Sequence, residues 1–120
     1  MRKKIIIIDD EPDVLRVLEI RLKKSGYEVF TGLNGQEALN LAHQIKPDLI
    51  ILDVYLPLIN GDEVAKILKN DLKLKHIAII LISATTQSLA QKTKESGADG
   101  FLVKPFESVE LIEMIEKALK

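Results

Sequence analysis

The chain has 120 residues, close to the common size of one folding domain, and 47% of them are hydrophobic, which is enough for a core. Its 17 basic and 18 acidic residues leave a net charge of −1, so nothing indicates binding to nucleic acid or to an anionic membrane. The sequence contains no membrane-length apolar run, no signal-peptide pattern and no cysteine, which excludes disulfides and thiolate metal sites. We therefore expect a single domain over residues 1–120, located in the cytoplasm.

Short apolar segments alternate along the chain with amphipathic segments of helical periodicity. Three apolar segments are rich in Ile and have no polar face, which is typical of central parallel strands, while two less apolar segments resemble edge strands. In chain order we expect strands at 5–8, 27–30, 49–52, 77–82 and 100–103, and helices at about 14–22, 34–45, 64–68, 86–95 and 108–119. This alternation predicts an α/β fold, (βα)5, with a doubly wound parallel five-stranded sheet, helices on both faces and the flavodoxin-like strand order 2-1-3-4-5.

Capping and breaking residues mark several helix ends. Asn34 is expected to cap the second helix, and Pro47 lies just beyond its end. Gly97 is expected to end the fourth helix, which has the weakest apolar stripe of the five. A helix with so few core contacts is the element that we expect to shift most readily.

Polar residues stand where four of the expected strands end. The first strand ends at Asp9 and Asp10, the third at Asp53, the fourth at Ser83 and the fifth at Lys104. The carboxyl ends of parallel strands lie on one edge of the sheet, and open α/β sheets bind ligands there, where the strand order reverses. In the expected order that reversal falls between the two strands that carry the carboxylates.

Three clustered carboxylates need a cation or a raised pKa. Asp9, Asp10 and Asp53 carry a formal charge of −3, Lys104 adds +1, and a divalent ion would bring the sum to zero. The available ligands are oxygens, which favours Mg²⁺ with several bound waters. Lys104 and the Ser83 hydroxyl would complete a clamp for phosphoryl oxygens, in which a carboxylate can form an aspartyl phosphate.

Four short motifs give the chain a resemblance to a known family over its whole length. They are "DDE" at 9–11, "D-x-x-L-P-x-x-x-G" at 53–61, "SA" at 83–84 and "KP" at 104–105. In this order and spacing they resemble the response-regulator receiver domains of two-component signalling. The resemblance implies that Asp53 accepts a phosphoryl group from the phosphohistidine of a sensor histidine kinase or a histidine phosphotransfer protein. It also implies that Asp9, Asp10, Asp53 and the backbone carbonyl of Tyr55 bind Mg²⁺.

The same resemblance implies a switch. Ser83, Ala84 and Lys104 are expected to contact the phosphoryl group, Phe101 to move inward with Ser83, and the Lys104–Pro105 peptide bond to be cis. The face of the fourth helix, fifth strand and fifth helix would then bind an output domain or a partner protein. The domain itself would bind neither nucleic acid nor membrane, and would be a monomer or a weak dimer.

The chain departs from the family at a few positions. Leu56 stands where Met is frequent, Ser83 where Thr is frequent, and Phe101 where Tyr is frequent. Tyr55, two residues after Asp53, flanks the mouth of the expected site. We expect its ring to hinder attacking water and prolong the phosphorylated state.

Simpler interpretations of the same residues remain open. Asp9 and Asp10 would also suit the cap of the first helix, Ser83 a turn hydroxyl, and Phe101 a plain core position. Two other functions are alternatives. A Mg²⁺-dependent phosphohydrolase of the haloacid-dehalogenase type would need a second Asp where Tyr55 stands. A flavodoxin-like cofactor binder would need a Ser/Thr/Gly-rich phosphate loop where this chain has "DDEPD".

We therefore expect a phosphoacceptor signalling domain, not an enzyme that turns over a small substrate. The sequence leaves open whether the chain is a complete regulator or a receiver from a larger protein.

Overall fold

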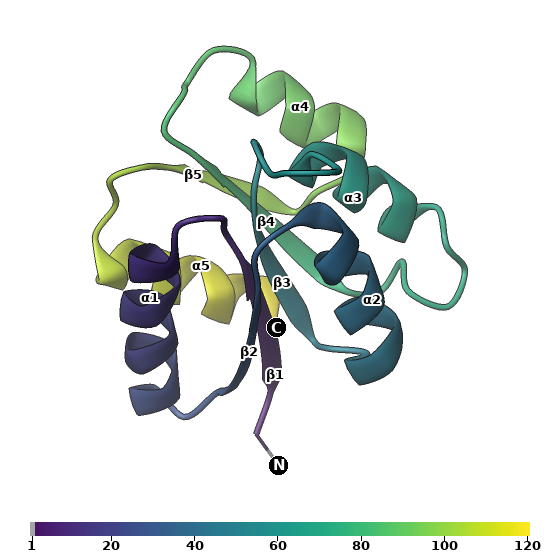
Figure 1. The fold of residues 1–120 in the computed structure, drawn as a ribbon. Coiled ribbons are helices and arrows are strands. Elements are labelled where there is room, and N and C mark those ends of the chain that lie inside the picture. The colour runs from purple at the N-terminus through teal and green to yellow at the C-terminus, as the bar shows by residue number, and fades with distance from the viewer. Residues whose placement is uncertain (1) are drawn as a thin grey trace.

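A computed structural model describes residues 2–120 as one parallel sheet of five strands in the order β2-β1-β3-β4-β5 (Figure 1). This confirms the predicted topology, with β1 and β3, the two carboxylate-bearing strands, side by side in register. The strands are β1 (Lys4–Ile8), β2 (Glu28–Gly32), β3 (Leu49–Asp53), β4 (Ala78–Ser83) and β5 (Gly100–Val103).

Among residues 2–120, four helices connect successive strands and a fifth follows β5, and together they cover both faces of the sheet (Figure 1). They are α1 (Pro12–Lys24), α2 (Gly35–Ile45), α3 (Gly61–Lys69), α4 (Leu89–Ser96) and α5 (Ser108–Ala118). Helices α1 and α5 pack in one hydrophobic cluster, and α2, α3 and α4 pack in the other. Within residues 2–120, no helix combines the length and apolar character that crossing a membrane requires.

The central strands are buried on both faces, which explains their uninterrupted apolar sequences. In β1, Ile5 and Ile7 face the cluster with α1 and α5, while Ile6 and Ile8 face the cluster with α2, α3 and α4. All four side chains have no exposed surface. Burying one such side chain stabilises a fold by roughly 1.5–3 kcal/mol, so this layer holds the sheet rigidly beneath its carboxyl edge.

The expected caps at Asn34 and Gly97 are confirmed, but α3 begins three residues earlier than expected and α4 three residues later. The Asn34 side chain accepts a hydrogen bond from the Glu37 backbone N–H at 2.8 Å, which confirms it as the cap of α2. The fourth helix, however, begins at Leu89 and not at residue 86. Ser88 adopts a left-handed conformation with φ of 60°, and a right-handed helix cannot run through such a residue. The expected start therefore fell inside a turn.

Candidate functional site

The polar strand ends meet at the carboxyl edge of the sheet. Asp9 follows β1, Asp53 ends β3, Ser83 ends β4 and Lys104 follows β5. Asp9, Asp53 and Ser83 are buried, at 0%, 7% and 1% exposure, although they stand at the rim of the sheet. The edge is therefore a place where the fold buries charge, and each buried charge requires a partner.

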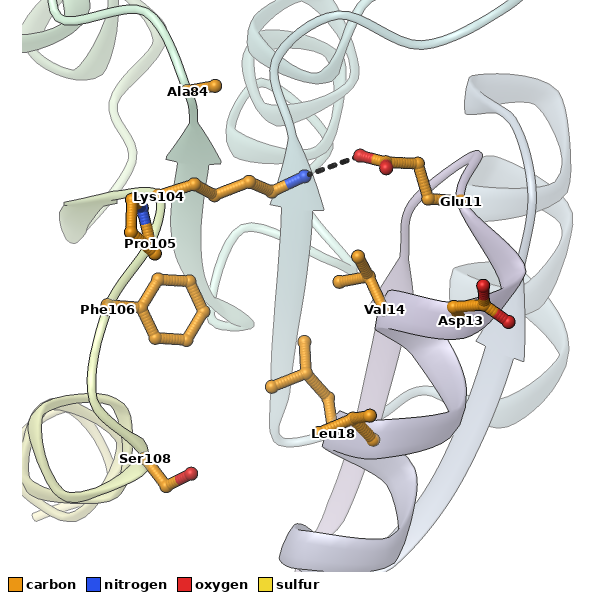
Figure 2. Close-up of a pocket in the computed structure, with 10 residues that line it drawn as sticks. Glu11, Asp13, Val14, Leu18, Ala84, Lys104, Pro105, Phe106 and Ser108 are labelled. Carbon is orange, nitrogen blue, oxygen red and sulfur yellow. Dashed lines mark ion pairs between the residues drawn. The ribbon is translucent and has the colours of Figure 1, made fainter.

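Lys104 supplies that partner to two carboxylates at once. Its Nζ donates to Asp9 Oδ2 at 2.7 Å and to Asp53 Oδ2 at 2.6 Å. The three residues come from the beginning, the middle and the end of the sequence, so the contact depends on the parallel strand order. Glu11 Oε1 lies 3.6 Å from the same ammonium group, and Figure 2 shows this ion pair between α1 and the segment after β5.

Backbone amides hold the other oxygen of each carboxylate. Asp9 Oδ1 accepts from the Glu11 N–H at 3.0 Å, and Asp53 Oδ1 accepts from the Tyr55 N–H at 3.0 Å. Both contacts span two residues, the turn-forming bond that Asp side chains favour. Asp9 therefore forms both the turn before α1 and the contact with Lys104. The N-cap of α1 is Glu11, which makes no side-chain cap bond, so the interpretation of Asp9 and Asp10 as helix caps is wrong.

Gly61 allows the chain to return close beneath the site. A Cβ at this position would collide with the carbonyl oxygen of Asp53. The Gly61 N–H also donates to the Val54 carbonyl at 2.7 Å, which fixes the start of α3 against the end of β3. Close backbone approach of this kind requires glycine, which accounts for the last residue of the 53–61 motif.

Burial and charge shift the ionisation of the two central groups. Burial raises the pKa of the Asp53 carboxyl, as does the negative charge of Asp9, although contacts with Lys104 and the Tyr55 amide oppose the rise. Burial lowers the pKa of the Lys104 ammonium, but its hydrogen bonds to Asp53 and Asp9 and their charges outweigh burial and raise it. Lys104 therefore stays positively charged. The ionised form of Asp53 is disfavoured by its partial burial and stabilised by Lys104.

Three carboxylates converge so closely that they could hold a metal ion. One oxygen each from Asp9, Asp10 and Asp53 lie within 4.8 Å of one another. Asp10 is exposed and the other two are buried, so the cluster opens to solvent on one side. All these donors are hard oxygens, which suits Mg²⁺ with its retained waters. The Tyr55 carbonyl remains a sequence-based expectation as a further ligand.

The remaining predicted residues surround this centre. Ser83 Oγ accepts from the Thr85 N–H at 3.0 Å, so its hydroxyl is engaged in the turn after β4. Phe101 lies on β5 and is 38% exposed. Ala84 is exposed beside Lys104, and the Lys104–Pro105 peptide bond is cis.

An apolar groove adjoins the Lys104 side of the site (Figure 2). It runs between α1 and the segment joining β5 to α5. Its lining includes Val14, Val17, Leu18, Ala84 and Phe106. Glu11 and Lys104 stand at its end nearest the carboxylates, so the groove leads to the acidic cluster.

Sequence reasoning missed one set of contacts near the site. Lys92 on α4 lies over the Tyr55 ring, with Nζ 5.3 Å from the ring centre, and 3.9 Å from Asp62 Oδ2. Nothing in the sequence distinguished Lys92 from the other lysines of the chain. Only the packing of α4 against α3 brings it there.

Comparison with known proteins agrees with this geometry. The family described as "Response regulator receiver domain" matches residues 5–116. The chain is 38% identical to the alkaline phosphatase synthesis transcriptional regulatory protein PhoP of Bacillus subtilis, over all of this chain and 50% of that protein. It is 32% identical to the DNA-binding response regulator MtrA of Mycolicibacterium smegmatis, over all of this chain and 52% of that protein. The chain thus spans about half the length of these relatives.

Solved structures give the same result. The chemotaxis response regulator CheY4 of Vibrio cholerae superposes with a TM-score of 0.92 at 32% identity, covering 99% of this chain and 100% of that one. The response regulator protein TrrA of Thermotoga maritima, solved in complex with Mg²⁺-BeF, superposes with a TM-score of 0.88 at 38% identity, covering 98% and 99%. The chain belongs to the response regulator receiver domains of two-component systems.

Proposed function

We propose that this domain accepts a phosphoryl group on Asp53 from the phosphohistidine of a sensor histidine kinase or a histidine phosphotransfer protein. The observation that carries the proposal is the Lys104 ammonium, which bridges Asp9 and Asp53 beside the exposed Asp10. A cluster of this kind pairs a nucleophilic carboxylate with groups that stabilise the charge of a transferring phosphoryl group.

Each residue has a defined part in the proposed transfer. An Asp53 oxygen attacks phosphorus, the phosphorus–nitrogen bond of the donor breaks, and the electron pair stays on the leaving imidazole, which takes up a proton. The Tyr55 amide orients the carboxylate through Oδ1, and Lys104, which donates to Oδ2, would stabilise the charge of the transferring phosphoryl group. Mg²⁺ held by Asp9, Asp10 and Asp53, with the Tyr55 carbonyl, would neutralise charge on acceptor and phosphoryl group.

Phosphorylation would change a distant surface through Ser83 and Phe101. In the proposed active state the Ser83 hydroxyl leaves the Thr85 amide and bonds a phosphoryl oxygen, beside Ala84. The exposed Phe101 ring then moves into the space that Ser83 vacates. The surface of α4, β5 and α5 would bind an output domain or a partner protein in one of the two states only.

The proposal extends to the organisation of the chain. We propose one receiver domain over residues 1–120, acting in the cytoplasm as a monomer or weak dimer. It would bind no nucleic acid directly and would not turn over a small substrate. The identity of Tyr55 supports this last point, because a phenol is a poor substitute for the carboxyl acid/base of a phosphohydrolase.

Incubation with acetyl phosphate and Mg²⁺, followed by intact mass measurement, tests the proposal. We expect one phosphoryl adduct, which chelator added beforehand prevents and which Asp53→Asn abolishes. Asp13→Asn is a matched control, because Asp13 is an exposed acid in the first turn of α1. An adduct of unchanged yield in Asp53→Asn would refute the assignment.

A further inference from the structure

Helix α4 reaches the phosphoacceptor site through one lysine. Lys92 Nζ lies 5.3 Å from the centre of the Tyr55 ring, within the range in which an ammonium group is attracted to an aromatic face. Tyr55 belongs to the loop between β3 and α3, and its backbone N–H holds Asp53 Oδ1. Lys92 on α4 therefore contacts a residue that itself contacts Asp53.

A second contact keeps Lys92 in this place. Its Nζ lies 3.9 Å from Asp62 Oδ2 at the start of α3. The two side chains are only 28% and 23% exposed, so the pair is shielded from solvent more than ordinary surface pairs. Asp62 Oδ1 is buried and has no hydrogen-bond partner among residues 2–120. Asp62 therefore depends on Lys92 for compensation of its charge, which restrains the lysine beside the ring.

The Tyr55 ring is only partly covered by the fold, which leaves it room to move. Its residue is 49% exposed and stands two positions after Asp53, a member of the acidic cluster. Hydrolysis of an aspartyl phosphate requires a water molecule to approach phosphorus opposite the Asp53 oxygen. A ring held at the mouth obstructs that approach, whereas a ring that swings into solvent does not.

We propose that Lys92 is a positioning residue that holds the Tyr55 ring at the mouth of the site and thereby slows loss of the phosphoryl group from Asp53. The inference rests on the proposed phosphorylation of Asp53. In the step concerned, the water oxygen attacks phosphorus and the bond from phosphorus to the Asp53 oxygen breaks. The carboxylate re-forms, orthophosphate leaves with one proton of the water, and the other proton passes to solvent.

The position of α4 should then affect the lifetime of the phosphorylated state. Any movement of α4 that withdraws Lys92 would release the ring and shorten the phosphorylated state. Any partner that fixes α4 in the position seen here would lengthen it.

A double-mutant cycle tests the proposal on the isolated chain. Lys92→Met keeps the apolar stem and removes the charge, and Tyr55→Ala removes the ring. Lys94→Met is the matched control, because Lys94 is an exposed lysine on the same helix. Each variant is phosphorylated with acetyl phosphate and Mg²⁺, the donor is removed, and decay of the adduct is followed by intact mass.

We expect Lys92→Met to speed decay about two- to fivefold, the factor that corresponds to an exposed cation–π contact. Lys94→Met should decay at the wild-type rate. In the Tyr55→Ala background, Lys92→Met should have no further effect, because the ring through which it acts is gone. Tyr55→Phe, which keeps the aromatic face, should remain sensitive to Lys92→Met. An equal effect of Lys92→Met with and without the ring, or none at all, would overturn the proposal.

Two further measurements separate the proposal from structural damage and from failure of phosphorylation. The cycle is repeated in an Asp62→Asn background, where loss of Lys92 leaves no unpaired acid. Lys92→Met should still accelerate decay there, but less than in the wild type, because Lys92 has already lost the contact that restrains it beside the ring. In the unphosphorylated chain, Lys92→Met should shift the NMR signals of the Tyr55 ring, and Lys94→Met should not. An unmoved ring signal refutes the contact itself, whereas a missing adduct in the wild type refutes the proposed function.

Discussion

The interior of the sheet and its carboxyl edge both bury side chains, but they are built on opposite chemistry. Ile51 in β3 is fully buried among aliphatic side chains, whereas Asp53, two residues later in the same strand, is 7% exposed beside another carboxylate. The first position gains stability from transfer out of water, and the second loses stability because an ionised group is desolvated.

The difference shows how the fold supports its site. The apolar layer beneath the edge stabilises the sheet strongly enough to hold charged groups at fixed positions that would be unfavourable on their own. Lys104 then compensates two of the carboxylates, and the third faces solvent. Because stability comes from the interior and the chemical groups lie at the edge, substitutions in the interior should change the free energy of unfolding. Substitutions at the edge should change the response to ligands.

The largest effect is expected in the interior. Ile51→Ala should lower the free energy of unfolding by roughly 2–5 kcal/mol, because it leaves a cavity in a layer that is packed on both sides. Urea denaturation measures the change, and Ile51→Val, expected to cost about 0.5–1.5 kcal/mol, is the graded control. A loss below 1 kcal/mol for the Ala variant would mean that the interior is not the source of stability.

At the edge, the expected effect depends on a ligand. Mg²⁺ at a hundred times its dissociation constant should raise the free energy of unfolding by about 2.7 kcal/mol, because we expect it to bind the folded cluster and not the unfolded chain. Asp10→Asn removes the exposed carboxylate and should weaken this response in thermal unfolding, with Asp13→Asn as the control. Equal Mg²⁺ responses in the wild type and Asp10→Asn would contradict the cluster as the binding site.

The loop after β3 offers a smaller effect of the opposite sign. Leu58 has a φ of 70° and is 79% exposed, so its side chain gains little from packing in a backbone conformation that disfavours it. Leu58→Gly should raise the free energy of unfolding by about 0.5–1 kcal/mol, the relieved strain less the added chain entropy. Leu72→Gly, at a residue 83% exposed with no positive φ, should lower it. Destabilisation by both changes would show that Leu58 is not strained.

The smallest effect concerns Tyr27, which lies next to the interior cluster of α1 and α5. Burial raises the pKa of its hydroxyl above the usual value, and the charge of Glu116 adds to the rise. A raised pKa in the folded state means that stability is retained below about pH 10 and lost as the pH rises through the folded value. Tyr27→Phe should therefore lose less stability between pH 9 and pH 11 than the wild type does. Identical pH profiles of the free energy of unfolding for the wild type and Tyr27→Phe, measured with denaturant, would show that Tyr27 ionisation does not affect stability.

The sequence predicted the interior and the edge well for a physical reason. Strands such as β1 and β3 are apolar on both faces only when helices cover both, and parallel strands must end on one edge, which brings Asp9 and Asp53 together. Local signals also sufficed at Asn34, whose side chain caps the helix that follows it.

Features that depend on tertiary packing were beyond the sequence. The start of α4 was misplaced because the left-handed conformation of Ser88 has no distinctive residue type to mark it. Lys92 is one lysine among many, and its contacts with Tyr55 and Asp62 arise only when α4 packs against α3. The contact between α4 and the loop that follows Asp53 is therefore visible only in the three-dimensional structure.

The central claim is that Asp53, held by Lys104 beside Asp9 and Asp10, is the residue that becomes phosphorylated. Reduction of the acetyl-phosphate-treated chain with borohydride, followed by peptide mass mapping, tests it most directly, because the reaction converts an aspartyl phosphate to homoserine at the modified position. We expect homoserine at position 53, dependent on Mg²⁺. Homoserine at position 9, 10 or elsewhere, with residue 53 unchanged, would contradict it.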